Sequence, residues 1–300
     1  MILSSFLRTI PISLEQGLAY GLVALGIVIS FRILAFPDLT VDGSFTLGAS
    51  VVARLIMEGA PPIVGILLAI VAGFLAGCCT GLLNTKLKIN SLLAGILVMT
   101  ILYSVNLRIM GRSNIQLLTV NTFLTPLENL HVNRFIPIIS FFFVVSVGFK
   151  FLSDLFFHTQ VGFAMRATGD NEQMIRTLGV DTDKMTVLGL GISNAFVALS
   201  GALVAQDQGF SDVGMGIGMI VAGLAAIIIG EALVGKQTVE RMTLAAIVGS
   251  IIYKFIIAVG LRLGLAPTDL KMATGAMVIL ALGIPALKKE KEGKLHLRGV

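Results

Sequence analysis

The chain has 300 residues, of which 56% are hydrophobic and 13% are charged, and its formal net charge is +5. Soluble domains carry about 25% charged residues, so this chain has too few polar side chains to cover a soluble globule of its size. Glycine is abundant, with 33 residues, as is usual where transmembrane helices pack closely. The composition excludes a soluble protein, gives no reason to expect a nucleic-acid partner, and indicates an all-α, polytopic integral membrane protein.

About nine segments are long and apolar enough to cross a bilayer, which takes about 20 mainly apolar residues. They are residues 14–33, 40–57, 62–83, 90–110, 135–157, 186–206, 217–235, 242–262 and 270–287. With this layout, roughly twice as many Lys and Arg residues fall on one side of the membrane as on the other, and the richer side is the cytoplasmic one. The connection 159–184 and the tail 288–300 are therefore expected in the cytoplasm, and the N-terminus outside. A re-entrant segment around residues 36–44 would reverse the N-terminus.

The layout contains an internal symmetry within a single domain, residues 1–300. Repeat one (about 14–110) and repeat two (about 186–287) each hold four spans with opposite orientation, and the span 135–157 links them. In both repeats a glycine-rich first helix is followed by a short acidic connection with Gly and Ser. Inverted repeats with interrupted segments are typical of transporters whose solute route lies between the halves.

Polar residues near these two connections are candidates to line such a route. The alternative is that they cap helices, since Asp, Ser and Thr commonly accept from free helix amides, and capping alone is favoured for Thr40 and Ser44. The pathway candidates are Asp38, Thr40, Asp42, Ser44, Asn194, Asp207, Ser211 and Lys254.

Lys254 stands apart because it is a basic residue near the middle of a predicted span. Charges inside a membrane are costly and usually face protein or water. Two interpretations are equally consistent with the sequence. Either Lys254 contacts a substrate carboxylate or an acid such as Asp207, or its helix is shifted and the ammonium snorkels to the interface.

Residues 160–183, QVGFAMRATGDNEQMIRTLGVDTD, are a polar stretch between apolar spans. Glycines mark its ends, as expected for a short surface helix. The stretch contains G-x-x-x-R-A-x-G-x-N and resembles the cytoplasmic coupling segment of ATP-binding-cassette importer permeases of the branched-chain amino acid and ribose type. The strings GLVALG at 21–26, PDLTVDGS at 37–44 and LGA at 47–49 resemble the opening of the same permeases.

Residues 214–235 resemble the later repeat of these permeases, although Glu231 stands where a second glycine is usual. Within the family, the chain is most similar to the branch assigned to tryptophan and tyrosine.

The resemblance implies that residues 159–184 form a coupling helix, which fits a groove in a soluble ATPase and moves as a rigid body. Met165, Met174, Ile175 and Leu178 are expected to fill that groove. The alternative is an ordinary solvated loop. The coupling residues that the resemblance implies are Gly162, Arg166, Ala167, Gly169, Asp170, Asn171, Arg176 and Gly179.

A string at residues 230–236, GEALVGK, fits the start of a phosphate-binding loop. Gln237 follows where a magnesium-binding Ser or Thr is required, and the string ends an apolar helix rather than following a strand. The chain is therefore not expected to be an enzyme, and ATP hydrolysis is expected in a separate subunit. The adjacent Cys78 and Cys79 and the three scattered histidines suggest no metal or cofactor.

The function that the resemblance implies is the permease subunit of an ATP-driven importer in the bacterial inner membrane, with an aromatic or branched-chain amino acid as the expected solute. Its implied partners are two copies of a cytoplasmic ATP-binding subunit, a second permease copy, an extracytoplasmic solute-binding protein and membrane lipid. The alternative is an ion-coupled secondary transporter, which would need buried carboxylates that bind a proton or sodium ion.

Overall fold

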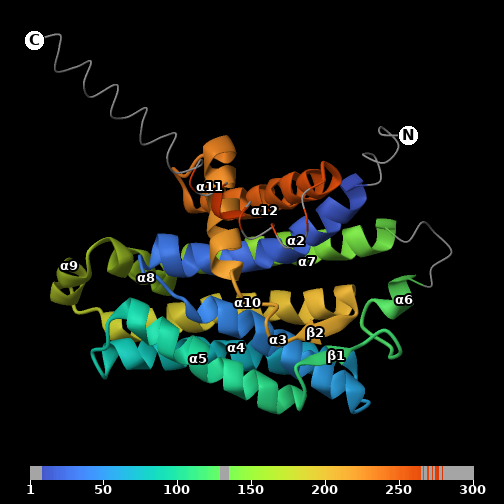
Figure 1. The fold of residues 1–300 in the computed structure, drawn as a ribbon. Helices are drawn as coiled ribbons and strands as arrows, with labels where there is room; N and C mark the ends of the chain where they lie inside the picture. The colour runs from blue at the N-terminus through green and yellow to red at the C-terminus, as the bar shows by residue number, and fades with distance from the viewer. Residues whose placement is uncertain are drawn as a thin grey trace, which may run out of the picture.

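The computed structural model describes residues 9–128 and 135–264, together with a few isolated residues up to 279. The described chain is all-α apart from one short pair of strands (Figure 1). The helices in chain order are α2 (Thr9–Ile27), continued by the π-helix η1 (Val28–Ile33), then α3 (Thr40–Met57), α4 (Pro62–Thr85), α5 (Ser91–Met110), α6 (Thr125–Glu128), α7 (Phe135–Phe157), α8 (Gln160–Asp170), α9 (Glu172–Thr177), α10 (Thr182–Gln208), α11 (Met219–Val234) and α12 (Val239–Arg262). Strands β1 (Asn114–Gln116) and β2 (Phe210–Asp212) pair antiparallel, with Ile115 opposite Ser211.

Six helices in the described part of the chain are long and apolar enough to cross a membrane: residues 10–33 (α2 with η1), α4, α5, α7, α10 and α12. The expected spans from 14–33 to 242–262 each coincide with a helix. Two of those helices, α3 and α11, fall outside the six, because α3 is polar and α11 has only 16 residues. The expected span 270–287 lies almost entirely outside the described residues, and the tail 288–300 lies outside them completely.

The helices form a bundle with two different ends (Figure 1). The short helices α8 and α9 lie at one end, and β1, β2 and α6 lie at the other. The long helix α10 and the first span are mostly buried inside the bundle, whereas few residues of α5 and α7 are buried. The first span and α10 are therefore the central helices, and α5 and α7 are peripheral.

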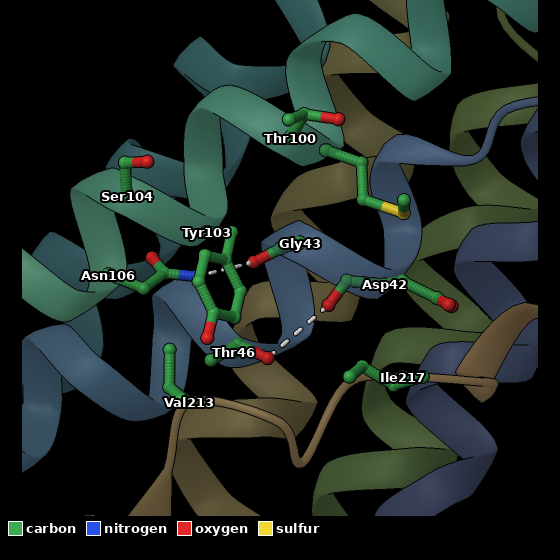
Figure 2. A pocket seen from close by; sticks show the side chains of 10 residues that line it. Asp42, Gly43, Thr46, Thr100, Tyr103, Ser104, Asn106, Val213 and Ile217 are labelled. Atoms are coloured by element: carbon green, nitrogen blue, oxygen red, sulfur yellow. Dashed lines mark hydrogen bonds between the residues drawn. The ribbon is translucent and has the colours of Figure 1, made fainter. Parts of the chain in front are cut away.

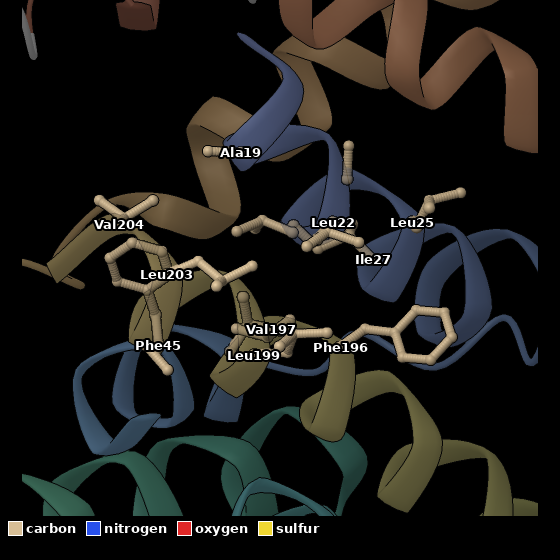
Figure 3. Close-up of a cluster of buried hydrophobic side chains, with 14 of the residues drawn as sticks. Ala19, Leu22, Leu25, Ile27, Phe45, Phe196, Val197, Leu199, Leu203 and Val204 are labelled. Atoms are coloured by element: carbon tan, nitrogen blue, oxygen red, sulfur yellow. The ribbon is translucent and has the colours of Figure 1, made fainter. Parts of the chain in front are cut away.

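The core is built where α2, α3 and α10 meet (Figure 3). Leu22 and Leu25 of α2, Phe45 of α3 and Leu199 and Leu203 of α10 are all almost fully buried. Serine hydroxyls add hydrogen bonds between the same helices, since Ser200 Oγ on α10 donates to the Ala19 carbonyl on α2 at 2.7 Å. Such polar bonds hold membrane helices together without a hydrophobic driving force.

Glycines allow α4 to approach α10 closely. Gly73, Gly77 and Gly81 recur at every fourth residue and all face α10. A Cβ added at Gly73 would lie 2.5 Å from the Asn194 carbonyl oxygen, and one at Gly77 would overlap the Leu190 carbonyl. The small-residue spacing in the sequence predicts this close crossing, and the structure confirms it.

Candidate translocation pocket and coupling helices

A buried polar network joins α3, α4 and α10. The Asp38 carboxylate accepts from the Thr40 amide at 2.9 Å and from Asn194 Nδ2 at 2.7 Å. Ser44 Oγ donates to Asn194 Oδ1 at 2.7 Å, and the Thr40 and Thr80 hydroxyls are 2.6 Å apart. All five side chains are fully buried. Four of the pathway candidates are thus brought together, with Asp38 capping the start of α3. Whether this network also borders a solute route remains a prediction.

Asp42 has a different role, because it caps α11 from a neighbouring helix. Its two carboxylate oxygens accept from the Gly218 and Ile220 amides at 2.8 and 2.9 Å. Thr46 Oγ1, one turn further along α3, accepts from the Gly216 amide at 3.1 Å. A carboxylate at a helix N-terminus is favoured by the helix dipole, so α3 fixes where α11 begins, between the two ends of the bundle (Figure 1).

The remaining pathway candidates lie apart from this network. Ser211 is buried in β2, and Asp207 is half-buried in the last turn of α10. The Lys254 ammonium lies 3.3 Å from the centre of the Tyr20 ring. A cation over an aromatic face is a stabilising contact. The partner that the structure shows for Lys254 is therefore an aromatic ring on α2, which the spacing of charges in the sequence could not reveal.

A pocket of about 360 Å³ lies between α3, α5 and the segment that leads into α11 (Figure 2). Asp42 and Thr46 belong to its α3 wall, and Tyr103 belongs to its α5 wall. The sequence indicates Asp42 as a candidate but not the α5 residues, because α5 has the pattern of an ordinary apolar span. The pocket is lined by Asp42, Gly43, Thr46, Met99, Thr100, Tyr103, Ser104, Asn106, Val213 and Ile217.

The predicted coupling stretch forms two helices rather than one. Thr159 caps α8, where its hydroxyl accepts from the Gly162 amide at 3.2 Å, and Asn171 caps α9, where its side chain accepts from the Met174 amide at 3.0 Å. Asp181 caps α10 in the same way, and the hydrogen bond from the Lys184 amide lowers the pKa of its carboxyl. Three consecutive caps explain why this polar stretch breaks into short helices.

The predicted coupling residues divide between an inner and an outer face. Gly162 is buried, and Gly169 lies so close to η1 that an added Cβ would overlap the Ile33 carbonyl oxygen. Arg166 is half-buried, with its guanidinium 5.5 Å from the centre of the Phe163 ring, and Ala167 is half-buried beside it. The exposed members are Asp170, Asn171, Arg176 and Gly179.

The guanidinium of Arg176 forms hydrogen bonds to other residues of the chain. It donates to Glu172, Thr182 and Asp183 at 2.6–2.7 Å. These bonds tie α9 to the first turn of α10.

Two of the apolar residues expected to fill an ATPase groove face inward instead. Met165 and Ile175 are buried, because α8 and α9 must cover the end of the bundle with one face. The exposed apolar side chains of this surface are Val161, Phe163, Met174 and Leu178, of which Val161 is the least exposed. Phe163 was missed in the sequence, although its spacing of two residues from Met165 places it on the other side of the helix.

In the described residues, no group of three or more His, Cys, Asp or Glu side chains could hold a metal ion.

The bundle of membrane-spanning helices with a short helix pair at one end defines a multi-pass membrane transport protein. Residues 10–282 match the family model described as "Branched-chain amino acid transport system / permease component". The chain therefore belongs to this family of ABC importer permeases.

Two relatives and one solved structure are similar to this chain. The tyrosine transport system permease protein of Clostridioides difficile is 46% identical over 269 residues, covering 90% of this chain and 88% of that protein. An uncharacterized protein of Rickettsia prowazekii is 35% identical over 285 residues, covering 93% and 97%. The structure of PsaBC from Streptococcus pneumoniae in complex with Fab matches with a TM-score of 0.51 at 15% identity, covering 92% of this chain and 90% of that one. This last match supports the fold alone.

The family confirms the expectation that the chain is the permease component of an ABC transport system and a multi-pass protein of the inner membrane. The family is a transporter family and not an enzyme family. An importer of this family works with ATP-binding and substrate-binding partners. The alternative of an ion-coupled secondary transporter is set aside.

Proposed function

We propose that the chain carries an aromatic amino acid, tyrosine foremost, into the cell as the permease of an ATP-driven importer. The observation that carries the solute assignment is the 46% identity, over most of both chains, to a permease named for tyrosine transport. An extracytoplasmic binding protein delivers the solute, and two ATP-binding subunits hydrolyse ATP at the cytoplasmic face.

The helices α8 and α9 are the docking surface for these ATP-binding subunits. Phe163, Met174 and Leu178 are 52%, 52% and 68% exposed, which is unusual for large apolar side chains on a polar segment. Exposed apolar residues rimmed by charges are typical of protein–protein contacts. Asp170 and Arg166, four residues apart on α8, supply charges beside this apolar surface.

The inner face of α8 connects this docking surface to the membrane-spanning helices. Gly169 contacts the backbone at Ile33, the last residue of η1. Short π-helices are often found at functional sites, and two residues later Ala35 adopts a left-handed φ of +51°. Such a conformation costs a non-glycine residue about 1–3 kcal/mol. A displacement of α8 therefore acts on a strained connection between the first span and α3.

An ion pair extends the route to α11. Arg32 in η1 contacts Glu231 at 2.5 Å, and the Glu231 side chain is only 9% exposed. Because Asp42 holds the other end of α11, movement of η1 reaches the pocket of Figure 2 through α11 as well as through α3.

The nine-span count and the inverted repeat are also part of this proposal. In support, α10 of repeat two packs on α3 and α4 of repeat one, whereas α2 of repeat one packs on α11 and α12 of repeat two. The first helix of each repeat thus packs in the other repeat, and this reciprocal exchange is consistent with a two-fold axis in the membrane plane. A second copy of the permease completes the pathway as a homodimer.

The test is uptake of labelled L-tyrosine by vesicles that contain the permease with its ATP-binding and solute-binding partners. We expect uptake that requires ATP and that L-phenylalanine and L-tryptophan inhibit more strongly than ribose. Uptake driven by a sodium or proton gradient without ATP would contradict the importer. ATP-driven uptake of leucine but not of tyrosine would contradict the aromatic solute.

A further inference from the structure

One face of α5 is polar, although the helix spans the membrane. Thr100, Tyr103 and Ser104 are spaced three and four residues apart and therefore share a face. Apart from Arg108 in the last turn, the other exposed side chains of α5 are apolar, as at Val105. A polar stripe on a membrane helix is costly against lipid tails. This face must therefore meet protein, water or solute.

Several polar groups at this face have no hydrogen-bond partner in the described part of the chain. Among the described residues, the Tyr103 and Ser104 hydroxyls form no hydrogen bond. Asn106 donates from Nδ2 to the Gly43 carbonyl at 3.2 Å, but its Oδ1 is buried and has no partner in the described part of the chain. Polar groups without hydrogen bonds cost free energy in a dry environment. Because several of them lie at one pocket, they indicate that a bound molecule or water supplies the missing hydrogen bonds.

The pocket in front of this face has the size and lining of a small-molecule site. Its volume of about 360 Å³ is at the lower end of the roughly 300–1,000 Å³ of such sites. Met99, Tyr103, Val213 and Ile217 form apolar walls, and Asp42 is the one charged residue among the ten that line it (Figure 2).

We propose that this pocket binds the aromatic amino acid as it crosses the permease, with the ring between Met99, Tyr103 and Ile217 and the ammonium group near Asp42. This inference rests on the proposed function. Aromatic rings pack favourably on tyrosine rings and on methionine sulfur. The Gly218 and Ile220 amides at the start of α11 fix the Asp42 carboxylate in place, so its negative charge attracts the ammonium group from a constant position.

The hydroxyls of α5 give the pocket its second recognition element. Tyr103 and Ser104 can bond the carboxylate or the phenol group of the solute. An aliphatic solute such as leucine would leave part of the apolar wall unpacked. The pocket therefore favours aromatic over branched-chain amino acids.

The test places a cysteine at Ser104, in a chain whose Cys78 and Cys79 are replaced by alanine and which is assembled with its ATP-binding subunits. We expect Ser104→Cys to react with a membrane-impermeant thiol reagent, and L-tyrosine to slow the reaction several-fold while L-leucine has little effect. The matched control is Val105→Cys, an exposed apolar position of α5 that does not line the pocket; it is 38% exposed and is expected to resist the reagent because it faces lipid.

Uptake gives a second measurement on the same wall. Tyr103→Ala is expected to raise the tyrosine concentration for half-maximal uptake about tenfold, whereas Tyr103→Phe, which keeps the ring, changes it much less.

The outcomes separate the pocket from the importer. If the wild-type assembly takes up tyrosine but tyrosine does not protect Ser104→Cys, or the cysteine does not react in any nucleotide state, the pocket assignment is wrong and the proposed function stands. If protection is equal for tyrosine and leucine, the aromatic preference is wrong. If the wild-type assembly takes up no aromatic amino acid, the proposed function is wrong, and the pocket assignment that rests on it is wrong as well.

Discussion

Single backbone atoms limit how closely α4 and α10 approach each other. At Gly77 of α4, the space that a side chain would need is filled by the Leu190 carbonyl of α10, which is backbone and cannot rotate away. At Gly148 of α7, nothing lies within 4 Å of an added Cβ. Both positions are helical glycines, so they separate the effect of packing from the effect of helix propensity.

We expect Gly77→Ala to destabilise the protein and Gly148→Ala to leave it unchanged or slightly more stable. Overpacking a tight contact costs about 1–3 kcal/mol, whereas alanine favours a helix over glycine by about 1 kcal/mol. Thermal unfolding of the purified permease in detergent measures the difference. Equal stability of the two variants would show that α4 and α10 do not approach as described.

At the scale of the element, the two faces of α8 have different surroundings. Its outer face presents Phe163, and its inner face places Gly169 against the end of η1. The resemblance to known permeases places Gly169 among the residues that couple to an ATPase. In the structure Gly169 lies against η1, within the permease itself. A substitution at Gly169 therefore affects transmission through the permease and leaves the docking surface in place.

We expect Gly169→Ala to uncouple transport from ATP hydrolysis. The added methyl group must push α8 away from Ile33, while Phe163, Met174 and Leu178 remain exposed for docking. ATP-binding subunits should still co-purify, and tyrosine uptake per ATP hydrolysed should fall several-fold. Asp170→Ala, at the exposed neighbouring position, is the control. An unchanged ratio of uptake to hydrolysis in Gly169→Ala would refute this role for the contact.

At the scale of the whole molecule, we predict that the two ends of the bundle belong to opposite sides of the membrane. The helices α8 and α9 form one end, and β1, β2 and the segment before α6 form the other (Figure 1). The accumulation of Lys and Arg predicts that the α8 and α9 end is cytoplasmic. The docking proposal requires the same orientation.

Single cysteines at Gln173 in α9 and at Asn121 before α6, both exposed positions, test this orientation in the cysteine-free chain. In intact cells we expect an impermeant reagent to label Asn121→Cys and to leave Gln173→Cys unlabelled. Permeabilised cells provide the control, because both sites should then react. Labelling of Gln173→Cys from outside would overturn the orientation and the coupling assignment with it.

The sequence by itself determined the long apolar helices of the described chain and their order. Apolar length marks membrane helices because unpaired backbone groups are not tolerated in lipid, so the expected spans from 14–33 to 242–262 each coincide with a helix. Spacing alone also predicted the Gly73, Gly77 and Gly81 contact stripe. The polar string around Arg166 marked the helices at the end of the bundle, because a stretch so polar cannot lie within the membrane.

Only the tertiary structure decided what each polar residue touches. Asp38 and Asn194 are 156 positions apart in the chain, and Asp42 caps a helix that begins 177 residues later. Lys254 lies over Tyr20, and Met165 and Ile175 turn inward where the sequence places them on a docking surface. The pocket wall on α5 was likewise hidden in an apolar span. Periodicity reports which face of one helix is polar, but the partner of that face depends on how distant segments pack together.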